Sequence, residues 1–427
     1  MMRKTKYWYK IDNAGKIFPA VSKYERSNVF RLSFYIHEDV DPILLEETVQ
    51  KLLPRFETFA VQMRSGFFWN YLSENNRLFK IHPEIPQLCH YFRPVYNQGY
   101  LFRVYYLKNK ITMETFHTIT DGFGALAFLK AIVYHYLKAK NLPVEHEGKI
   151  LSEKPFSANE SEDAFVTYYD KTKKKSLKEE KAFRFKGESF NQHWSLMAKA
   201  RINSKQILKL VKEKYQATIT QYVCAVFAYA VYQESTQFIQ NKKPFKLFIP
   251  VNLRSYFKTK TLRNFSLYIK ATYPVADRNL SFEEILALTK EYFKDQLDKE
   301  KLQQRLSSNV GFEKNMFIRF LPLVLKNIVL RIGYNILAEE ISTSSISNLG
   351  VVDLPLSMKP YVLDCDFVNG GYGMTTTLIS LYDHTNIILN TSIKDLSIMH
   401  SIFNFFVNDG LDITLTTNYL EGYDEIL

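Results

Sequence analysis

The hydrophobic pattern of the first 140 residues changes repeatedly between runs typical of strands and runs typical of helices. Residues 29–36 are rich in β-branched and aromatic side chains, which predicts a strand. Similar runs at 100–107 and 111–116 are separated by only three residues and predict a β-hairpin. Two shorter runs within residues 59–71 predict a second hairpin. These runs account for the strands expected in the first part of the chain.

Apolar residues at helical spacing lie between these strand-like runs. Asp41 followed by Pro42 is a favourable helix start and predicts a helix over residues 41–53. Residues 125–137 have the length and apolar spacing of a largely buried helix. Strands and helices that alternate in this way predict an α/β fold.

The pattern fades around residues 145–190 and then begins again. Residues 194–202 predict a strand, and helices are expected from Ser204 and over residues 220–232. The second part therefore repeats the first in kind. Its other predicted elements are strands at 246–250, 267–273, 375–381 and 386–391 and helices at 281–303 and 397–408.

The length of the chain also favours two units. At 427 residues it exceeds the usual size of a single hydrophobic core. Residues 171–181 are a run of charged side chains, which predicts a linker or an exposed crossover. We therefore expect two halves, 1–180 and 181–427, each an α/β two-layer sandwich.

The most apolar stretch of the sequence covers residues 316–331. It is interrupted by Pro322 and by three charges, unlike a helix that spans a bilayer. We expect a buried or channel-lining helix here and no transmembrane segment. Contact with a membrane interface is the alternative interpretation.

Composition narrows the range of partners. The formal net charge of +12 favours anionic partners such as a phosphorylated cofactor, an acidic carrier protein or a membrane face. The basic residues are spread along the sequence without a recognisable nucleic-acid motif, so we expect no nucleic-acid partner.

The cysteines and histidines give no pattern of a metal site. Cys89, Cys224 and Cys365 are widely spaced and form neither a metal-ligand pair nor an even disulfide framework. The first ten residues lack the apolar core of a signal peptide. We therefore expect a reducing, cytoplasmic location and chemistry that needs no metal.

The strongest chemical candidate is the segment Phe-His-Thr-Ile-Thr-Asp-Gly at residues 116–122. It falls at the predicted junction between a strand and a helix. A histidine with a fixed ring can act as a base near neutral pH, and His117 has Asp121 four residues away and Gly122 after it. The competing interpretation is that Asp121 only caps the helix and that His117 is an ordinary strand residue. Local sequence leaves both open.

Three further segments follow this motif in order: Pro-Val-Asn-Leu-Arg at 250–254, Arg-Asn-Phe at 263–265 and Ile-Ser-Asn-Leu-Gly at 346–350. Together they resemble the chloramphenicol-acetyltransferase-like acyltransferase superfamily, in particular its branch of alcohol acetyltransferases and condensation domains. The resemblance spans nearly the whole chain. It implies two halves that meet in a V-shaped pseudo-dimer, with a central tunnel that leads to the histidine.

The resemblance also implies roles for individual residues. His117 would be the general base on an acceptor alcohol or amine. Asp121 would point away from substrate and pair with Arg254, and Gly122 would permit tight packing of the loop. The co-substrate would be an acyl-CoA, such as acetyl-CoA, or an acyl donor linked to phosphopantetheine. No permanently bound cofactor is implied.

Polar residues in the later motifs are further candidates. Ser347 and Asn348 could donate hydrogen bonds to a developing oxyanion, and Asn252 could contact substrate. An equally open interpretation places all three in turns or at the end of a strand.

The sequence departs from the condensation-domain pattern at Phe116, where those enzymes carry a second histidine. This departure argues against peptide-bond condensation and in favour of an alcohol acetyltransferase-like enzyme. Two alternatives remain: a condensation-type acyltransferase whose donor is bound to an acidic carrier protein, and a catalytically inactive binding protein of the same fold.

Overall fold

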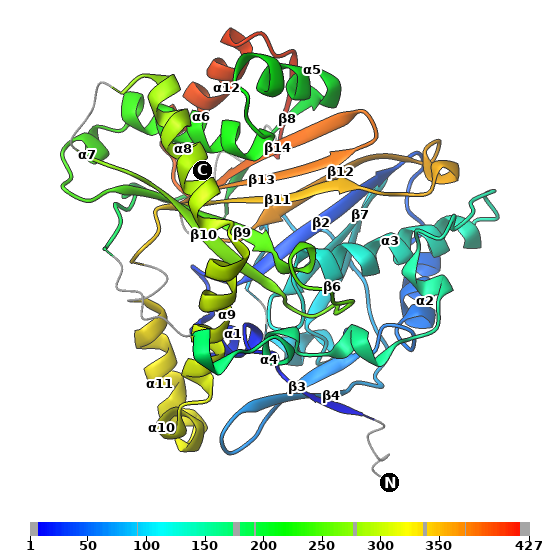
Figure 1. Ribbon diagram of the computed structural model, residues 1–427. Helices are drawn as coiled ribbons and strands as arrows, with labels where there is room; N and C mark the ends of the chain where they lie inside the picture. Colours follow the sequence, from blue (N-terminus) through cyan, green and yellow to red (C-terminus); the bar gives the residue numbers. More distant parts are fainter. Residues whose placement is uncertain are drawn as a thin grey trace.

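The computed structural model describes residues 7–91, 93–173, 180–191, 194–275, 280–335, 340–371 and 373–418. In these residues the strands form sheets of three, five and seven strands (Figure 1). We call the five-stranded sheet with its helices the first lobe, and the seven-stranded sheet with its helices the second lobe. The α/β class and the two-lobed architecture that the sequence predicts are confirmed.

The first lobe is built around a mainly antiparallel sheet. Only its last two strands, β5 and β6, are parallel within the described sheet. Helix α3 packs against β2 and β7, and α2 packs against α3. The order of the strands and the two helices is β12 (Val362–Asn369), β2 (Val29–Ile36), β7 (Lys110–Phe116), β6 (Phe102–Leu107), β5 (His82–Pro83), with α2 (Pro42–Leu52) and α3 (Gly122–Ala139).

A helix cap and an aromatic contact hold the two helices of this lobe in place. The Asp41 carboxylate accepts hydrogen bonds from the backbone N–H groups of Ile43 and Leu44, so α2 begins where the sequence predicts. The ring of Phe128 on α3 lies 4.4 Å from the ring of Phe59, between centroids, and both are fully buried. Aromatic burial of this kind holds α3 against the core.

The second lobe carries the larger sheet. Its helices α6 (Ile219–Glu234), α8 (Phe282–Gln296) and α12 (Ser397–Asn408) pack on one another, and α8 also packs against β10. The strand order is β10 (Ser266–Tyr273), β9 (Phe245–Asn252), β11 (Ser344–Val352), β13 (Met374–Leu381), β14 (His384–Thr391), β8 (Leu196–Asn203) and β15 (Ile413–Thr417).

The small sheet corresponds to the second hairpin that the sequence predicts. It has the order β1 (Trp8–Lys10), β4 (Asn70–Glu74), β3 (Val61–Ser65). Both hairpin strands begin two or three residues later than predicted. For β3 the reason is that Phe59 packs in the core of the first lobe and does not belong to the strand.

The stretch predicted as a linker contains short helical segments and extended chain. One of these segments is α4 (Ala164–Thr167). Other short helices lie elsewhere in the described chain, among them α1 (Phe18–Val21), α5 (Ser204–Lys209) and α7 (Thr236–Ile239). Most of the predicted charge run, residues 174–179, lies outside the described residues.

The helix predicted over residues 281–303 is wrong in one respect, because the structure has two helices there. α8 ends at Gln296, and α9 (Lys299–Glu313) begins after Asp298. The Asp298 carboxylate accepts from the backbone N–H groups of Glu300 and Lys301, which starts a new helix. The sequence pattern did not show this second cap.

Of the two interpretations offered for residues 316–331, a buried or a channel-lining helix, the buried one is wrong. The segment forms α10 (Met316–Phe320) and α11 (Leu323–Tyr334), separated at Pro322, and most of its apolar side chains are exposed. Proline lacks the backbone N–H that a continuous helix needs. No helix in the described part of the chain combines the length and the apolar character needed to cross a membrane.

Strand β12 joins the lobes. It follows β11 of the second lobe in sequence, yet it pairs antiparallel with β2 of the first lobe. The chain then returns to the seven-stranded sheet through β13. A strand from the second half of the chain therefore completes the sheet of the first lobe, and the space between the lobes is bounded by both sheets.

Candidate active site

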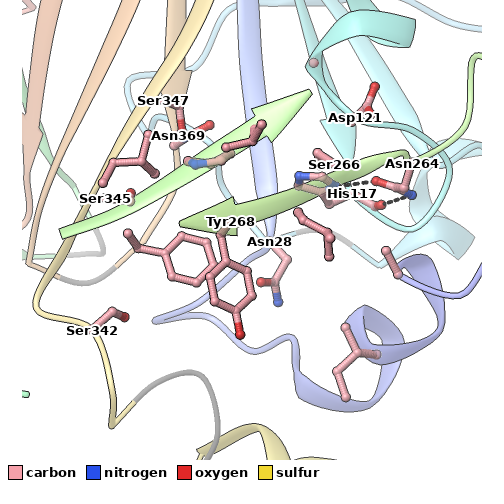
Figure 2. Close-up of a pocket in the computed structure, with 18 of the residues that line it drawn as sticks. Asn28, His117, Asp121, Asn264, Ser266, Tyr268, Ser342, Ser345, Ser347 and Asn369 are labelled. Carbon is pink, nitrogen blue, oxygen red and sulfur yellow. Dashed lines mark hydrogen bonds between the residues drawn. The ribbon is translucent and has the colours of Figure 1, made fainter. Parts of the chain in front are cut away.

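A cavity of about 1620 Å³ lies where the two lobes meet, and residues of both lobes line it. Figure 2 shows His117 and Asp121 from the first lobe on one side of this space and Ser345 and Ser347 on the other. All the site residues predicted from the sequence line this cavity: His117, Asp121, Gly122, Asn252, Arg254, Ser347 and Asn348.

His117 directly follows β7, where the strand leads into the turn before α3. Its backbone N–H donates to the carbonyl of Asn28 at 3.0 Å, which continues the pairing of β7 with β2 for one more residue. Its ring stacks on Phe18 with centroids 4.7 Å apart, and the edge of Phe30 approaches it at 5.2 Å. The two aromatic rings fix the plane of the imidazole.

Asn264 of the second lobe determines how the imidazole is protonated. Its Nδ2 donates to Asp12 Oδ2 at 3.1 Å and to the His117 carbonyl at 2.9 Å. Both partners accept, so the amide nitrogen belongs on that side and Oδ1 faces His117 Nδ1 at 2.8 Å. Because an amide oxygen can only accept, Nδ1 carries the hydrogen and Nε2 of the neutral ring is the basic atom. Figure 2 shows this contact as dashed lines.

Asp12 anchors this network and is completely buried. Its Oδ1 accepts from the backbone N–H of Gly15, and its Oδ2 accepts from Asn264. The guanidinium of Arg263 lies 3.6 Å from Oδ2 and supplies a nearby positive charge. Asn264 is itself 1% exposed. A buried amide with partners on both sides has one orientation, so it presents a fixed acceptor to the histidine.

Asp121 serves two purposes at the start of α3. Its Oδ1 accepts from the backbone N–H of Gly124, which caps the helix. Its Oδ2 accepts from Arg254 Nη1 at 2.7 Å and from the backbone N–H of Phe265 at 2.9 Å. The Asp121 carboxylate therefore caps the helix of the first lobe and also ties it to the second lobe, so it is more than a helix cap.

Arg254 is held along its whole guanidinium group. Besides Asp121, it donates to the carbonyls of Thr261 and Arg263, at 3.0 and 2.6 Å. Its guanidinium carbon lies 4.5 Å from the ring centroid of Phe123. In the pair of Asp121 and Arg254, each side chain is 7% exposed, so the ion pair is buried where the two lobes touch.

Two glycines allow the close approach at this junction. A Cβ atom on Gly124 would lie 2.0 Å from the backbone oxygen of Leu262, which excludes any side chain without a backbone shift. A Cβ atom on Gly122 would lie 2.5 Å from the side chain of Leu349. Leu262 and Leu349 belong to the second lobe, so both glycines serve the contact between the lobes.

Of the three polar candidates, Ser347 is the one that is buried. It lies on β11, and its Oγ accepts from Asn369 Nδ2 at 2.9 Å. Asn348 is exposed and binds Thr220 Oγ1 and the backbone N–H of Gly350. Asn252 accepts from the backbone and the side chain of Arg254. The structure thus places Ser347 and Asn348 in a strand, and Asn252 at the end of one.

Sequence reasoning did not identify Asn264, Asp12 or Phe18 as residues of the site. The signal available for Asn264 was its place in the Arg-Asn-Phe triplet, which supported only the resemblance. Asp12 and Phe18 come from a segment with no motif, and they reach His117 only through the fold.

A second group of charges lies near this network. Asp163 accepts from the backbone N–H of Asn13, which lines the cavity. Burial raises the pKa of Asp163 to about 6, and the carboxylate of Asp12 adds to the rise while Lys16 opposes it. Within the described residues, no cluster of three or more His, Cys, Asp or Glu side chains is arranged to hold a metal ion.

Solved structures with the same fold include several acyl-transferring proteins. TRI3 trichothecene 15-O-acetyltransferase from Fusarium sporotrichioides is 11% identical, with a TM-score of 0.60 over 94% of each chain. Polyketide synthase associated protein 5 from Mycobacterium tuberculosis is 12% identical, with a TM-score of 0.56 over 93% of this chain and 96% of that one. A starter condensation domain of rhizomide synthetase, solved with C8-CoA and Leu-SNAC, is 11% identical, with a TM-score of 0.56 over 94% and 93%.

These identities are low enough that the likeness concerns the fold. No family model and no curated protein matches the sequence. The fold shared with an acetyltransferase and with condensation domains is the one that the sequence resemblance implies.

Proposed function

We propose that this chain, which has the fold shared by chloramphenicol-acetyltransferase-like acyltransferases and condensation domains, transfers an acyl group from a thioester to an alcohol or amine. The observation that carries the proposal is the chain of hydrogen bonds from Asp12 through Asn264 to His117 Nδ1. It leaves Nε2 as a base in a cavity that is large enough for two substrates.

In this mechanism His117 Nε2 takes the proton from the acceptor hydroxyl or amine while its oxygen or nitrogen attacks the thioester carbonyl carbon. The tetrahedral intermediate then collapses, the carbon–sulfur bond breaks, and the departing thiolate receives the proton from the imidazolium. Because Ser347 Oγ accepts from Asn369, its own hydrogen is free to point elsewhere. We assign it as a donor to the oxyanion of the intermediate.

The donor that we propose is an acyl-CoA, with acetyl-CoA as the simplest case. A neighbour of the same fold was solved with C8-CoA, which supports the proposal of an acyl-CoA donor. The second candidate is an acyl group on the phosphopantetheine arm of an acidic carrier protein, which the formal charge of +12 favours. Thiol release with free acyl-CoA and no carrier would decide for the first.

The test is a panel of acyl-CoA donors incubated with pooled alcohols and amines, followed by free-thiol release and product mass. With a working pair, we expect His117→Ala to lower turnover by about 10²- to 10⁴-fold, the usual contribution of a general base. The thermal transition should stay near that of the parent, because Asn264 Oδ1 is the one polar contact of the ring within the described residues, and the bond from Asn264 Nδ2 to the His117 backbone carbonyl remains.

The matched control is His135→Ala. His135 lies on α3, away from the cavity residues, and contacts Ser152 and Glu153. It should leave turnover unchanged. Unchanged thiol release in folded His117→Ala would exclude the proposed base. The absence of turnover with every donor, including a loaded carrier protein, would favour a binding protein that has lost catalysis.

A further inference from the structure

Exposed apolar side chains gather at one corner of the molecule. Phe317 is 88% exposed and Val324 is 74% exposed, and their apolar neighbours on the same segments are exposed too, whereas apolar residues exposed singly are common on protein surfaces. They belong to α10 and α11, which project at the lower left of Figure 1 beside β3 and β4. We call this surface the apolar corner; its exposed residues are Phe67, Phe68, Met316, Phe317, Phe320, Val324, Leu325, Ile328, Val329 and Ile332.

The loop between β3 and β4 and the two helices form one surface. The backbone N–H of Leu323 donates to the carbonyl of Phe67 at 2.9 Å, and Lys326 Nζ donates to the carbonyl of Phe68 at 2.7 Å. The rings of Phe68 and Phe320 meet edge to face, 6.2 Å apart. These contacts hold the apolar side chains of both segments at fixed positions.

The charges of this segment all have one sign. From residue 314 to residue 335 the sequence has four basic residues and no acidic residue. Lys314, Arg319 and Arg331 are exposed at the edge of the corner, whereas Lys326 is buried over the ring of Trp69. The preceding acid, Glu313, is paired with Lys16. An exposed apolar face edged by cations matches a bilayer surface with anionic head groups.

The apolar corner also borders the cavity. Val329, Leu330 and Tyr334 of α11 line the same cavity as His117, and so does Trp69 at the end of the β3–β4 loop. A molecule dissolved in lipid at this corner would therefore lie beside the site. α11 has 12 residues, which at 1.5 Å per residue is too short to span about 30 Å of hydrocarbon. The segment can lie in the interface and cannot cross it.

We propose that α10, α11 and the β3–β4 loop dock on an anionic membrane surface, and that an apolar substrate dissolved in that membrane enters the cavity there. The occupant is a phospholipid bilayer, because the corner combines apolar side chains with cations and residues 314–335 include no acidic residue. The entry of substrate rests on the proposed acyltransferase function, whereas the docking does not.

The docking test needs no catalytic activity. Purified protein is sedimented with vesicles of phosphatidylcholine alone and with vesicles that contain about one third phosphatidylserine. We expect binding to the anionic vesicles and at least tenfold weaker binding for the double variant Phe317→Ser/Val324→Ser, because two large side chains no longer enter the apolar boundary. Arg319→Gln should weaken binding to anionic vesicles by about fivefold.

The matched control is Ile43→Ser/Leu356→Ser, which removes two apolar side chains of similar exposure elsewhere on the surface. It should bind like the parent. Failure of the parent to bind anionic vesicles, or equal losses in the control, would overturn the proposal. So would a parent dimer in sedimentation velocity that the double variant dissociates, because the corner would then be an interface between copies.

The entry of substrate is tested separately. A long-chain alcohol carried in vesicles and a short water-soluble alcohol are compared as acceptors. We expect turnover of the double variant to fall at least fivefold with the first alcohol and to match the parent with the second, because Phe317 and Val324 do not line the cavity. An equal change in turnover with the two alcohols would overturn membrane entry. Absence of turnover with both in the parent would instead contradict the acyltransferase function.

Discussion

At the scale of single residues, the site depends on an asparagine that connects a buried carboxylate to the imidazole. Asn264 accepts from His117 Nδ1 and donates to Asp12, so it transmits a fixed orientation and carries no net charge itself. A carboxylate in its place would stabilise the imidazolium, whereas the amide leaves the neutral form available to take a proton. The amide therefore suits a base that must start each cycle without a proton.

We expect Asn264→Ala to lower kcat by about 10- to 100-fold with KM little changed, because the ring loses its orienting partner. Asn264→Asp keeps the acceptor against Nδ1, but its second oxygen faces two acceptors, Asp12 Oδ2 and the His117 carbonyl, so this carboxyl holds a proton and reproduces the contacts of the amide. We expect Asn264→Asp to keep a higher kcat than Asn264→Ala while that proton is bound, and to lose this advantage as the pH rises and the proton is lost. The measurement is kcat against pH for both variants and the parent.

Two results would contradict this role for Asn264. One is full activity in Asn264→Ala. The other is an equal kcat of Asn264→Asp and Asn264→Ala at every pH, which would mean that the acceptor does not orient the ring. Thermal unfolding of each variant supplies the control, because a loss of Asp12 pairing lowers stability without moving the profile.

At the scale of elements, the junction between β7 and α3 is where the lobes are fastened. Asp121 caps α3 and also accepts from Arg254 and from the backbone of Phe265. Gly124 allows the backbone of Leu262 to approach at this point. The position of His117, four residues before Asp121, is therefore set by contacts that belong to both lobes.

A double-mutant cycle on Asp121→Ala and Arg254→Ala tests this fastening. Each single change should cost about 3 kcal/mol or more of unfolding free energy, because it leaves the partner charge buried. The coupling between the two should be about 1–3 kcal/mol, measured by urea unfolding. The exposed pair of Glu47 and Lys51 is the matched control, with an expected coupling of about 0.5 kcal/mol at most. Equal couplings for the two pairs would show that the buried pair does not hold the lobes together.

The elements themselves were largely predictable, and the failures have physical causes. The strands at 29–36 and 111–116 and the closing helix at 397–408 follow from local pattern and are present at those positions. The break at Asp298 is a cap within a continuous amphipathic pattern. The exposure of α10 and α11 could not be predicted. Apolar periodicity indicates which side chains share a helix face, but it does not indicate whether protein or another phase covers that face.

The same limit applies to the candidate site. The motif at 116–122 places His117 at the end of a strand from local sequence alone. Its partner Asn264 lies 147 positions away, and the carboxylate behind it lies at position 12. Only the fold brings these three together, so no local pattern of hydrophobic and polar residues identifies the network.

At the scale of the whole molecule, buried charges link the sheets. Lys199 of β8 donates to Asp364 and Asp366 of β12, at 3.0 and 2.9 Å, and so connects the seven-stranded sheet to the strand that enters the first lobe. Burial opposes ionisation of Asp364. The hydrogen bond from His384 and the charge of Lys199 nevertheless hold the pKa of Asp364 well below its usual range. This carboxylate therefore stabilises the fold above its unfolded pKa.

The pKa of Asp163 is shifted in the opposite direction, above its usual range. Because burial raises its pKa from 3.8 to about 6, the folded protein binds more protons than the unfolded chain between these values. The stability that protonated Asp163 contributes is present in full below about pH 4, and it is lost as the pH rises through 6. The difference between these two values corresponds to about 3 kcal/mol at neutral pH. The cost arises mainly from the burial of the carboxylate, and the nearby carboxylate of Asp12 adds to it.

We therefore expect Asp163→Asn to raise the unfolding free energy by about 1–2 kcal/mol at pH 7 and by little at pH 4. The expected gain is smaller than about 3 kcal/mol because the amide keeps only one of the two acceptor oxygens of the carboxylate. That oxygen can serve the backbone N–H of Asn13, while the N–H of Val166 is already bonded to the Asp163 carbonyl. Urea unfolding from pH 4 to pH 8 measures the effect, with the exposed Asp39→Asn as the matched control. If the difference in unfolding free energy between Asp163→Asn and the parent does not grow with pH, the buried Asp163 carboxylate does not destabilise the folded protein, and the charges around it compensate for its burial.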